Sequence, residues 1–177
     1  MLTFTLLINA SHGRSPPQFR AGGDNFLLPA DNSTVDININ GTELLLDFYS
    51  KTESDTIVEN AQVAADTEFK ILRMWCDGIL LEPWFKNHAV YQPRYFAGYL
   101  EQCPDAPTII TAPYQFNFPG TIVWSWQGQF WDWYFDHKNK FEVINFLEQE
   151  PDRVWKFRGS LDPCEDLVVK IKQVLDL

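Results

Sequence analysis

Four of the seven tryptophans lie within ten residues, and they have the clearest potential for binding chemistry. Gln127-Gly128 separates two runs of aromatic and β-branched residues, a pattern that predicts a hairpin over 121–135. Directly opposite side chains of a hairpin share a face, so this register places all four indoles on one side. Such a row either packs in the core or forms an exposed platform for a glycan or a protein, and both interpretations stay open. The predicted binding residues are Trp124, Trp126, Trp131 and Trp133.

Carboxylates near this aromatic run raise the question of catalysis. Asp132 and Asp136 flank it, and His137 follows. A glycosidase needs two carboxylates about 5 Å or about 6.5–9.5 Å apart, and a single sequence does not fix such a pair. The chain carries no Gly-x-Ser-x-Gly motif and no Gly-rich phosphate loop. We therefore expect no catalytic residues, with a small glycoside hydrolase using Asp132 or Asp136 kept as an alternative.

The acidic and cysteine residues do not form a metal-binding pattern. Four acids near turns could contribute to a calcium site, but the ordered spacing of a calcium loop is absent, so we interpret them as solvated turn residues. These acids are Asp55, Asp66, Glu68 and Asp77. The cysteines are widely spaced and predict reduced, structural thiols rather than zinc ligands. They are Cys76, Cys103 and Cys164. We expect no metal and no other cofactor.

Composition narrows the functional classes further. The 177 residues include 14 Lys and Arg against 24 Asp and Glu, a net charge of −10. This field repels phosphate, so we expect neither nucleic acid nor a membrane surface as a partner. Hydrophobic residues make up 45% and charged residues 21%, which is typical of a folded domain. No run approaches the roughly 20 apolar residues of a membrane helix, and the first eight residues lack the features of a signal peptide.

Alternating patterns predict the strands that position these residues. Residues 3–8 alternate as a strand, whereas residues 9–34 are rich in turn residues and predict a long arm or loop. Asn40-Gly41 lies between two alternating runs over 35–49, which predicts a hairpin. A further strand over 69–76 ends at Asp77-Gly78.

The C-terminal part differs in character. Residues 139–149 fit a helix or a strand, and residues 153–157 fit a strand. A helix is expected from Asp162 to Leu175, with apolar residues recurring along one face. We thus expect one domain over 1–177. It would be an antiparallel two-sheet β-sandwich or jelly roll over 35–135, preceded by the arm at 9–34. An α/β extension over 136–177 would end in an amphipathic helix. We predict that this helix packs on its own domain, with packing on another subunit as the alternative.

Several segments between Leu44 and Phe135 carry a family resemblance. They read Asp-Phe-Tyr-Ser-Lys-Thr at 47–52, Ser-Asp-Thr-Ile-Val at 54–58, Ala-Asp-Thr-Glu-Phe-Lys-Ile at 65–71, Asp-Gly-Ile-Leu-Leu at 77–81 and Phe-Trp-Asp-Trp-Tyr-Phe at 130–135. About half of the chain resembles β-sandwich proteins from virions of tailed phages, and calcium-dependent carbohydrate-binding modules of jelly-roll type. The resemblance implies a non-catalytic role in virion structure, decoration or attachment to host glycans. The calcium-ligand spacing of such modules is absent here.

We therefore expect a non-enzymatic virion protein that acts through assembly contacts. Its partners would be other virion proteins in an oligomeric assembly, and it would be located in the virion, with the cytoplasm as the alternative location. A carbohydrate-binding module with an aromatic face is the first alternative function, and the small glycoside hydrolase is the second.

Overall fold

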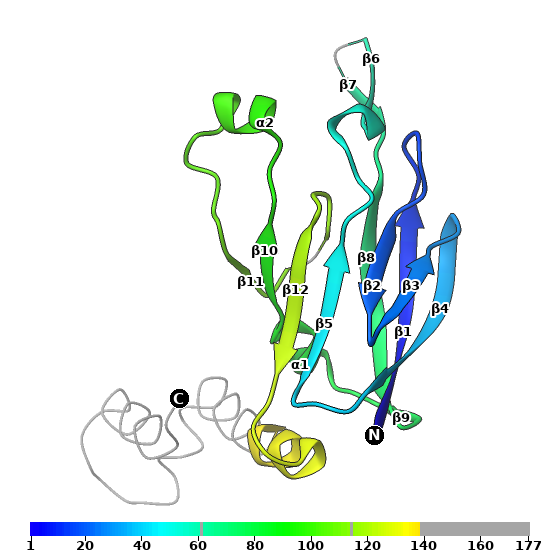
Figure 1. Ribbon diagram of the computed structural model, residues 1–177, viewed down its shortest axis with the longest axis vertical. Coiled ribbons are helices and arrows are strands. Elements are labelled where there is room, and N and C mark those ends of the chain that lie inside the picture. Colours follow the sequence, from blue (N-terminus) through cyan, green and yellow to red (C-terminus); the bar gives the residue numbers. More distant parts are fainter. Residues whose placement is uncertain (61, 114, 139–177) are drawn as a thin grey trace, which may run out of the picture. The chain divides into compact units, whose positions relative to one another are not determined.

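The computed structural model describes residues 1–60, 62–113 and 115–138. The chain divides into two compact units, Met1–Ser125 and Trp126–Leu177. The first unit contains two antiparallel sheets and a small two-stranded hairpin (Figure 1). The predicted mostly β, antiparallel sandwich is therefore confirmed, while the single domain over 1–177 stays a prediction.

Sheet A has the strand order β4-β1-β8-β9. Its strands are β4 (Asp31–Ile39), β1 (Leu2–Ser11), β8 (Glu68–Cys76) and β9 (Ile79–Leu80). β1 is central and alternates between buried and partly exposed side chains, with Phe4, Leu6 and Ile8 fully buried. This alternation buries one face of the sheet, as the sequence pattern at 3–8 predicts. Asp77 and Gly78, both with positive φ, form the turn between β8 and β9.

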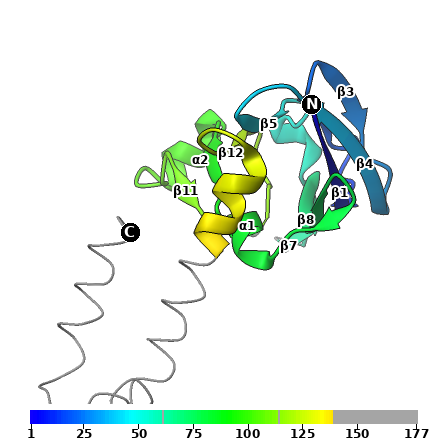
Figure 2. The ribbon, with the colours of Figure 1, turned by 90° about the horizontal axis from the view of Figure 1, so that it is seen from below.

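Sheet B has the strand order β11-β10-β12-β5-β2-β3. Its strands are β11 (Ile110–Thr111), β10 (Val90–Pro93), β12 (Gly120–Ser125), β5 (Glu43–Phe48), β2 (Gln18–Ala21) and β3 (Asp24–Leu27). The two sheets form facing layers (Figure 2). The Phe69 ring of sheet A lies 5.9 Å from the Phe19 ring and 5.2 Å from the Phe48 ring of sheet B. Burial of these aromatic side chains between the layers stabilises the sandwich.

Short elements complete the first unit. They are η1 (Glu53–Asp55), the hairpin strands β6 (Ile57–Glu59) and β7 (Gln62–Ala65), α1 (Pro83–Asn87) and α2 (Ala97–Gln102). None of the helices among the described residues is long and apolar enough to cross a membrane.

The structure corrects two predictions about the N-terminal half. Residues 9–34 are not an arm, because they contain the end of β1, all of β2 and β3, and the start of β4. Their turn residues mark short connections such as Gly22-Gly23, which joins β2 to β3 with positive φ at both glycines. The strands on either side of Asn40-Gly41 form, but they do not pair as a hairpin. β4 belongs to sheet A and β5 to sheet B, so the turn carries the chain from one layer to the other.

The predicted hairpin over 121–135 is also wrong. β12 forms its first strand, but residues 130–138 are helical. Within them Phe130 and Tyr134 stack at 5.7 Å, and Trp131 and Phe135 stack at 5.8 Å. Aromatic residues at these positions repeat with a helical period, which competes with the alternation of a strand. The elements predicted over 139–149, 153–157 and 162–175 lie outside the described residues.

Candidate functional site

The four predicted tryptophans are divided between the two units. Trp124 lies on β12 and is 1% exposed, and its indole Nε1 donates to the Lys86 carbonyl oxygen at 3.2 Å. Trp126 is buried, whereas Trp131 and Trp133 are half-buried. The prediction that all four indoles line one face needs a strand over 129–135. Those positions are largely helical, so that prediction is wrong. Trp124 packs as a core residue, and a binding role for the other three stays a prediction.

The carboxylates considered for catalysis lie on the same helical segment. Asp132 and Asp136 are exposed, one turn apart. The His137 ring stacks on Trp133 at 4.2 Å, and its Nδ1 donates to the Trp133 carbonyl oxygen at 2.8 Å. Both of these contacts join His137 to the preceding turn of its own helix.

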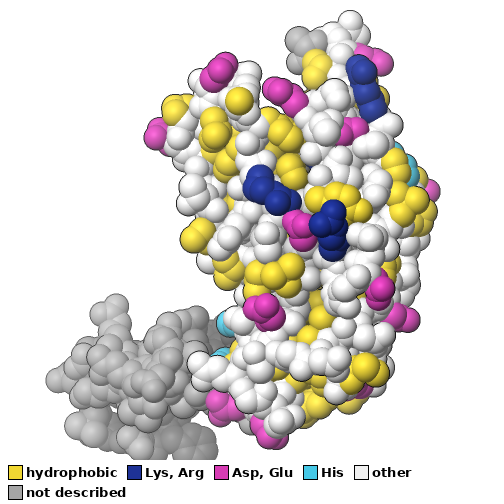
Figure 3. All heavy atoms as spheres, in the orientation of Figure 1, with side chains coloured by type: hydrophobic (Ala, Val, Ile, Leu, Met, Phe, Trp, Pro, Cys, Tyr) yellow, Lys and Arg dark blue, Asp and Glu magenta, His cyan; other side chains and the backbone are white. Residues whose placement is uncertain are grey.

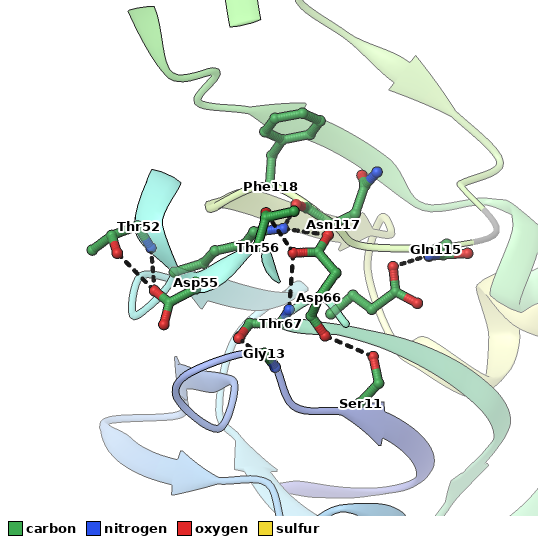
Figure 4. A network of polar contacts seen from close by, with 12 residues as sticks. Ser11, Gly13, Thr52, Asp55, Thr56, Asp66, Thr67, Gln115, Asn117 and Phe118 are labelled. Carbon is green, nitrogen blue, oxygen red and sulfur yellow. Dashed lines mark hydrogen bonds and ion pairs between the residues drawn. The ribbon is translucent and has the colours of Figure 1, made fainter. Parts of the chain in front are cut away.

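The acids considered for calcium each accept hydrogen bonds from groups of the protein itself. Figure 4 shows the surroundings of Asp55 and Asp66. Asp66 accepts from Lys51 at 2.6 Å and from the Thr56 hydroxyl at 2.7 Å. Asp77 accepts from the backbone N–H of Thr3 at 2.9 Å, and Gln115 donates to Glu68. In the part of the chain that the structure describes, no three His, Cys, Asp or Glu residues gather as a metal site. These acids do not fit a calcium ion.

Lys51 is the cation at the centre of this buried network. Its side chain is 2% exposed, and its Nζ also donates to the Asn117 carbonyl oxygen at 2.5 Å. The same Nζ lies 5.6 Å from the centre of the Phe118 ring. An ammonium group thus occupies the position between oxygen ligands that a metal ion would need. It ties the end of β5 to the segment after residue 114.

Asp55 forms the second half of the network. Its carboxylate accepts from the Ser15 hydroxyl at 2.6 Å and from the Thr52 backbone N–H and hydroxyl, both at 2.7 Å. Burial by itself raises the pKa of the Asp55 carboxyl, but these hydrogen bonds to the charged form outweigh burial and lower the pKa below its ordinary value. The charged groups of this network are thus paired or hydrogen-bonded within the protein, and the network connects separate loops of the fold.

The outer face of sheet B carries exposed polar side chains. The strand register aligns five outward residues across β10, β12, β5, β2 and β3. We call them the polar row: Gln92, Thr121, Asp47, Arg20 and Asn25.

Two arginines organise the centre of the polar row. Arg94 donates to Asp47 at 2.7 Å and to the Phe48 carbonyl oxygen at 2.9 Å, and its side chain remains 56% exposed. The Arg20 guanidinium lies 4.4 Å from the centre of the Tyr49 ring. Figure 3 shows basic side chains on either side of an acidic one near the centre of this face. The centre of the row therefore offers hydrogen-bond donors and acceptors in fixed positions.

An aromatic cluster adjoins one end of the polar row. It is made of Tyr95, Phe96, Tyr99 and Phe118. Tyr95 stacks on Tyr99 at 5.1 Å with 19° between the rings, and Tyr99 is 36% exposed. Tyr95 is held by its hydroxyl, which donates to the Pro107 carbonyl oxygen at 2.9 Å. Burial, and secondarily the neighbouring Tyr99, raise the pKa of Tyr95, so its hydroxyl is a neutral donor near pH 7.

A hollow adjoins another part of the same face. Its volume is about 470 Å³, within the range of small-molecule sites. Arg20, Glu43 and Leu45 contribute to it from the sheet, and the turns around Gly22 and Asn40 close it. A side chain at Gly22 would place its Cβ 2.7 Å from the Asn38 carbonyl oxygen, so the turn requires glycine there. The hollow thus extends the polar row with further amide and carboxylate groups.

This surface was not identified from the sequence, although part of it left a signal. Once 43–48 is assigned as a strand, the two-residue period predicts that Glu43, Leu45 and Asp47 share the face that points away from the core. The contacts of Arg94 and Arg20 with β5 depend on strand order, which alternation does not reveal. The four-residue spacing of Tyr95 and Tyr99 is that of neighbours on a helix, although only Tyr99 lies on α2.

No family model matches the chain, and no curated protein matches it either. One similar solved structure is a selenomethionine form of vCBM60, from work on two families of calcium-dependent carbohydrate-binding modules. It has a TM-score of 0.46 and 10% sequence identity, covering 71% of this chain and 91% of that one. Another is vCBM60 in complex with galactobiose, with a TM-score of 0.44 and 12% identity over 70% and 97% of the two chains. Similarity at this level does not indicate what the present chain binds.

Proposed function

We propose that the first unit is a non-catalytic glycan-binding module whose binding surface is the outer face of sheet B. The observation that carries the proposal is the stacked Tyr95–Tyr99 pair, with Tyr99 exposed, directly after Arg94, which binds Asp47 of the polar row. A sugar presents apolar C–H faces that pack on aromatic rings, and hydroxyls that need both donors and acceptors. The aromatic cluster provides rings, and the polar row provides guanidinium, carboxylate, amide and hydroxyl groups.

The arrangement favours binding over bond cleavage. Asp47 is already paired with Arg94. Paired charges with remaining hydrogen-bond capacity are well suited to orient hydroxyl groups.

The test is an oligosaccharide array followed by calorimetry on each glycan that binds. Tyr99→Ala removes an exposed ring, and stacking of about 1–3 kcal/mol per ring on bases, taken by analogy, predicts a loss of roughly tenfold in affinity. Trp131→Ala is the matched control, since it removes a half-buried ring from the second unit. Circular dichroism verifies that each variant is folded.

Two outcomes would contradict the proposal. One is a folded Tyr99→Ala variant that binds as tightly as the wild type while Trp131→Ala loses binding, which would move the site to the second unit. The other is the absence of binding to any glycan.

A second candidate function is assembly into a larger particle, with the virion as the proposed location. It is favoured by the β6–β7 hairpin, on which Val58 and Val63 face each other and are 61% and 64% exposed. An exposed apolar pair on a short hairpin gains stability when a partner subunit covers it. Light scattering and electron microscopy of the wild type and of Val58→Ser/Val63→Ser test this. A wild type that stays monomeric at all concentrations argues against assembly.

A further inference from the structure

A cavity of about 370 Å³ lies at the edge of sheet A, formed by β8, β9 and α1. β9 is two residues long and pairs with β8 only at Trp75 and Cys76. The edge of β8 beside Leu72 and Arg73 is therefore not covered by β9. None of the lining residues belongs to the polar row or to the aromatic cluster. They are Leu72, Arg73, Met74, Leu80, Leu81, Glu82, Pro83 and Lys86.

The cavity is largely apolar. Met74 and Leu81 are almost fully buried and supply its inner part. Leu72 and Leu80 are 43% and 54% exposed, and the neighbouring Ile79 is also 54% exposed. Exposure of several large aliphatic side chains around one cavity is unfavourable in water, and it marks a surface that gains stability when an apolar group covers it.

Charged residues also line the cavity, and their sign indicates what kind of head group a ligand would carry. Arg73 and Lys86 line it, and neither forms an ion pair within the described part of the chain. Glu82 also lines it, which leaves a formal charge of +1 on the lining. The whole chain has a net charge of −10, so the cavity is positively charged within a negatively charged protein. An apolar interior with two cations is complementary to an aliphatic chain that ends in an anion.

We propose that this cavity binds a small amphiphilic anion, such as an aliphatic carboxylate. The aliphatic chain of the ligand lies on Met74 and Leu81, and its carboxylate faces Arg73 and Lys86. The site is independent of the proposed glycan surface, because the two share no residue. Loss of one therefore does not entail loss of the other.

Calorimetry with decanoate below its micelle-forming concentration tests the proposal on the full chain. Decyltrimethylammonium keeps a chain of the same length and reverses the charge, while butyrate keeps the carboxylate and shortens the chain. We expect decanoate to bind with at least about fivefold higher affinity than either, since about 1 kcal/mol corresponds to fivefold. Absence of decanoate binding, or equal binding of decyltrimethylammonium, would overturn the proposal.

Variants locate the site. Arg73→Gln and Lys86→Gln should each weaken decanoate binding by about threefold to fivefold, as expected for a partly exposed charge pair. Leu80→Ser should weaken it by a similar factor, and Glu82→Gln should strengthen it. Arg14→Gln and Leu27→Ser are matched controls, because both residues are exposed and outside the cavity. If the controls weaken binding as much as the cavity variants do, the proposal is wrong.

Discussion

Two ion pairs in the first unit each join a basic side chain to an aspartate, but they differ in how far solvent reaches them. Lys51 and Asp66 pair at 2.6 Å, with side chains 2% and 19% exposed. Arg94 and Asp47 pair at 2.7 Å, with side chains 56% and 26% exposed. In the first pair both partners also bond to neighbouring protein groups, and in the second the guanidinium faces solvent. Distance alone therefore does not distinguish a structural pair from one available to a ligand.

Solvent access explains the difference. A buried charge without its partner loses hydration that nothing replaces, whereas an exposed charge is rehydrated when its partner is removed. Changes at Lys51 should therefore affect folding first, and changes at Arg94 should affect binding first.

The largest effect is expected from Lys51→Met. It leaves Asp66 without its cation and the Asn117 carbonyl oxygen without its donor. We expect the free energy of unfolding to fall by about 3 kcal/mol, the lower end of values for breaking a buried pair, since Asp66 retains some contact with water. Urea unfolding followed by circular dichroism measures this. The double variant Lys51→Met/Asp66→Asn should lose less than the sum of the single changes. Strict additivity would show that the pair is not coupled.

The next effect is expected from Asp55→Asn, and it depends on pH. The pKa of the folded-state carboxyl is lowered, so its contribution is fully present above the ordinary value near 3.8 and is lost as pH falls through the folded-state pKa. At pH 7 we expect a loss of about 1–2 kcal/mol, because hydrogen bonds from Ser15 and Thr52 to a charged acceptor are weakened. Unfolding at pH 7, 5 and 3 should show the wild type and the variant converging below about pH 4. A difference that stays constant over this range would contradict this assignment.

In the first unit, the sequence predicts where the strands lie better than it predicts which strands pair with each other. Alternation of buried and exposed residues locates β1, β4, β5 and β8, because one wet face gives a period of two. Strand pairing is set by packing across the layers instead. The turn at Asn40-Gly41 therefore joins two sheets, although its residues are those of a hairpin.

The candidate site depends on the features that the sequence leaves undetermined. Asp47 lies opposite Arg20 because β2 pairs with β5, and it meets Arg94 because β12 lies between β5 and β10, the strand that Arg94 follows. In contrast, the tryptophan pattern suggested a platform because aromatic residues suit strands as well as helices. In the residues from Phe130 onward, the helical spacing of the aromatic side chains prevails.

A smaller effect on stability, with a larger one on binding, is expected from Arg94→Gln. The exposed pair should contribute less than about 0.5 kcal/mol, so the unfolding midpoint should hardly change. Affinity for a bound glycan should fall by about fivefold to tenfold, because a charge-assisted donor bound to Asp47 of the polar row is lost. Arg14→Gln, an exposed arginine outside the row, should change neither quantity. A large fall in stability with unchanged affinity would reverse the roles assigned to the two ion pairs.

The smallest effect is expected from calcium. A calcium ion needs six to eight oxygen ligands, and an ammonium group already lies between Asp66 and the Asn117 carbonyl oxygen. A ligand that binds only the folded state stabilises it by RT ln(1 + [L]/Kd) and so raises the melting temperature. We therefore expect about 1 °C or less of change between excess EDTA and millimolar calcium, measured by differential scanning calorimetry. In Lys51→Met the cation is gone and Asp66 is released, so any calcium response should be larger than in the wild type. A strong stabilisation of the wild type by calcium would show that the lysine does not fill the role of the ion, and it would remove the basis for treating this network as self-contained.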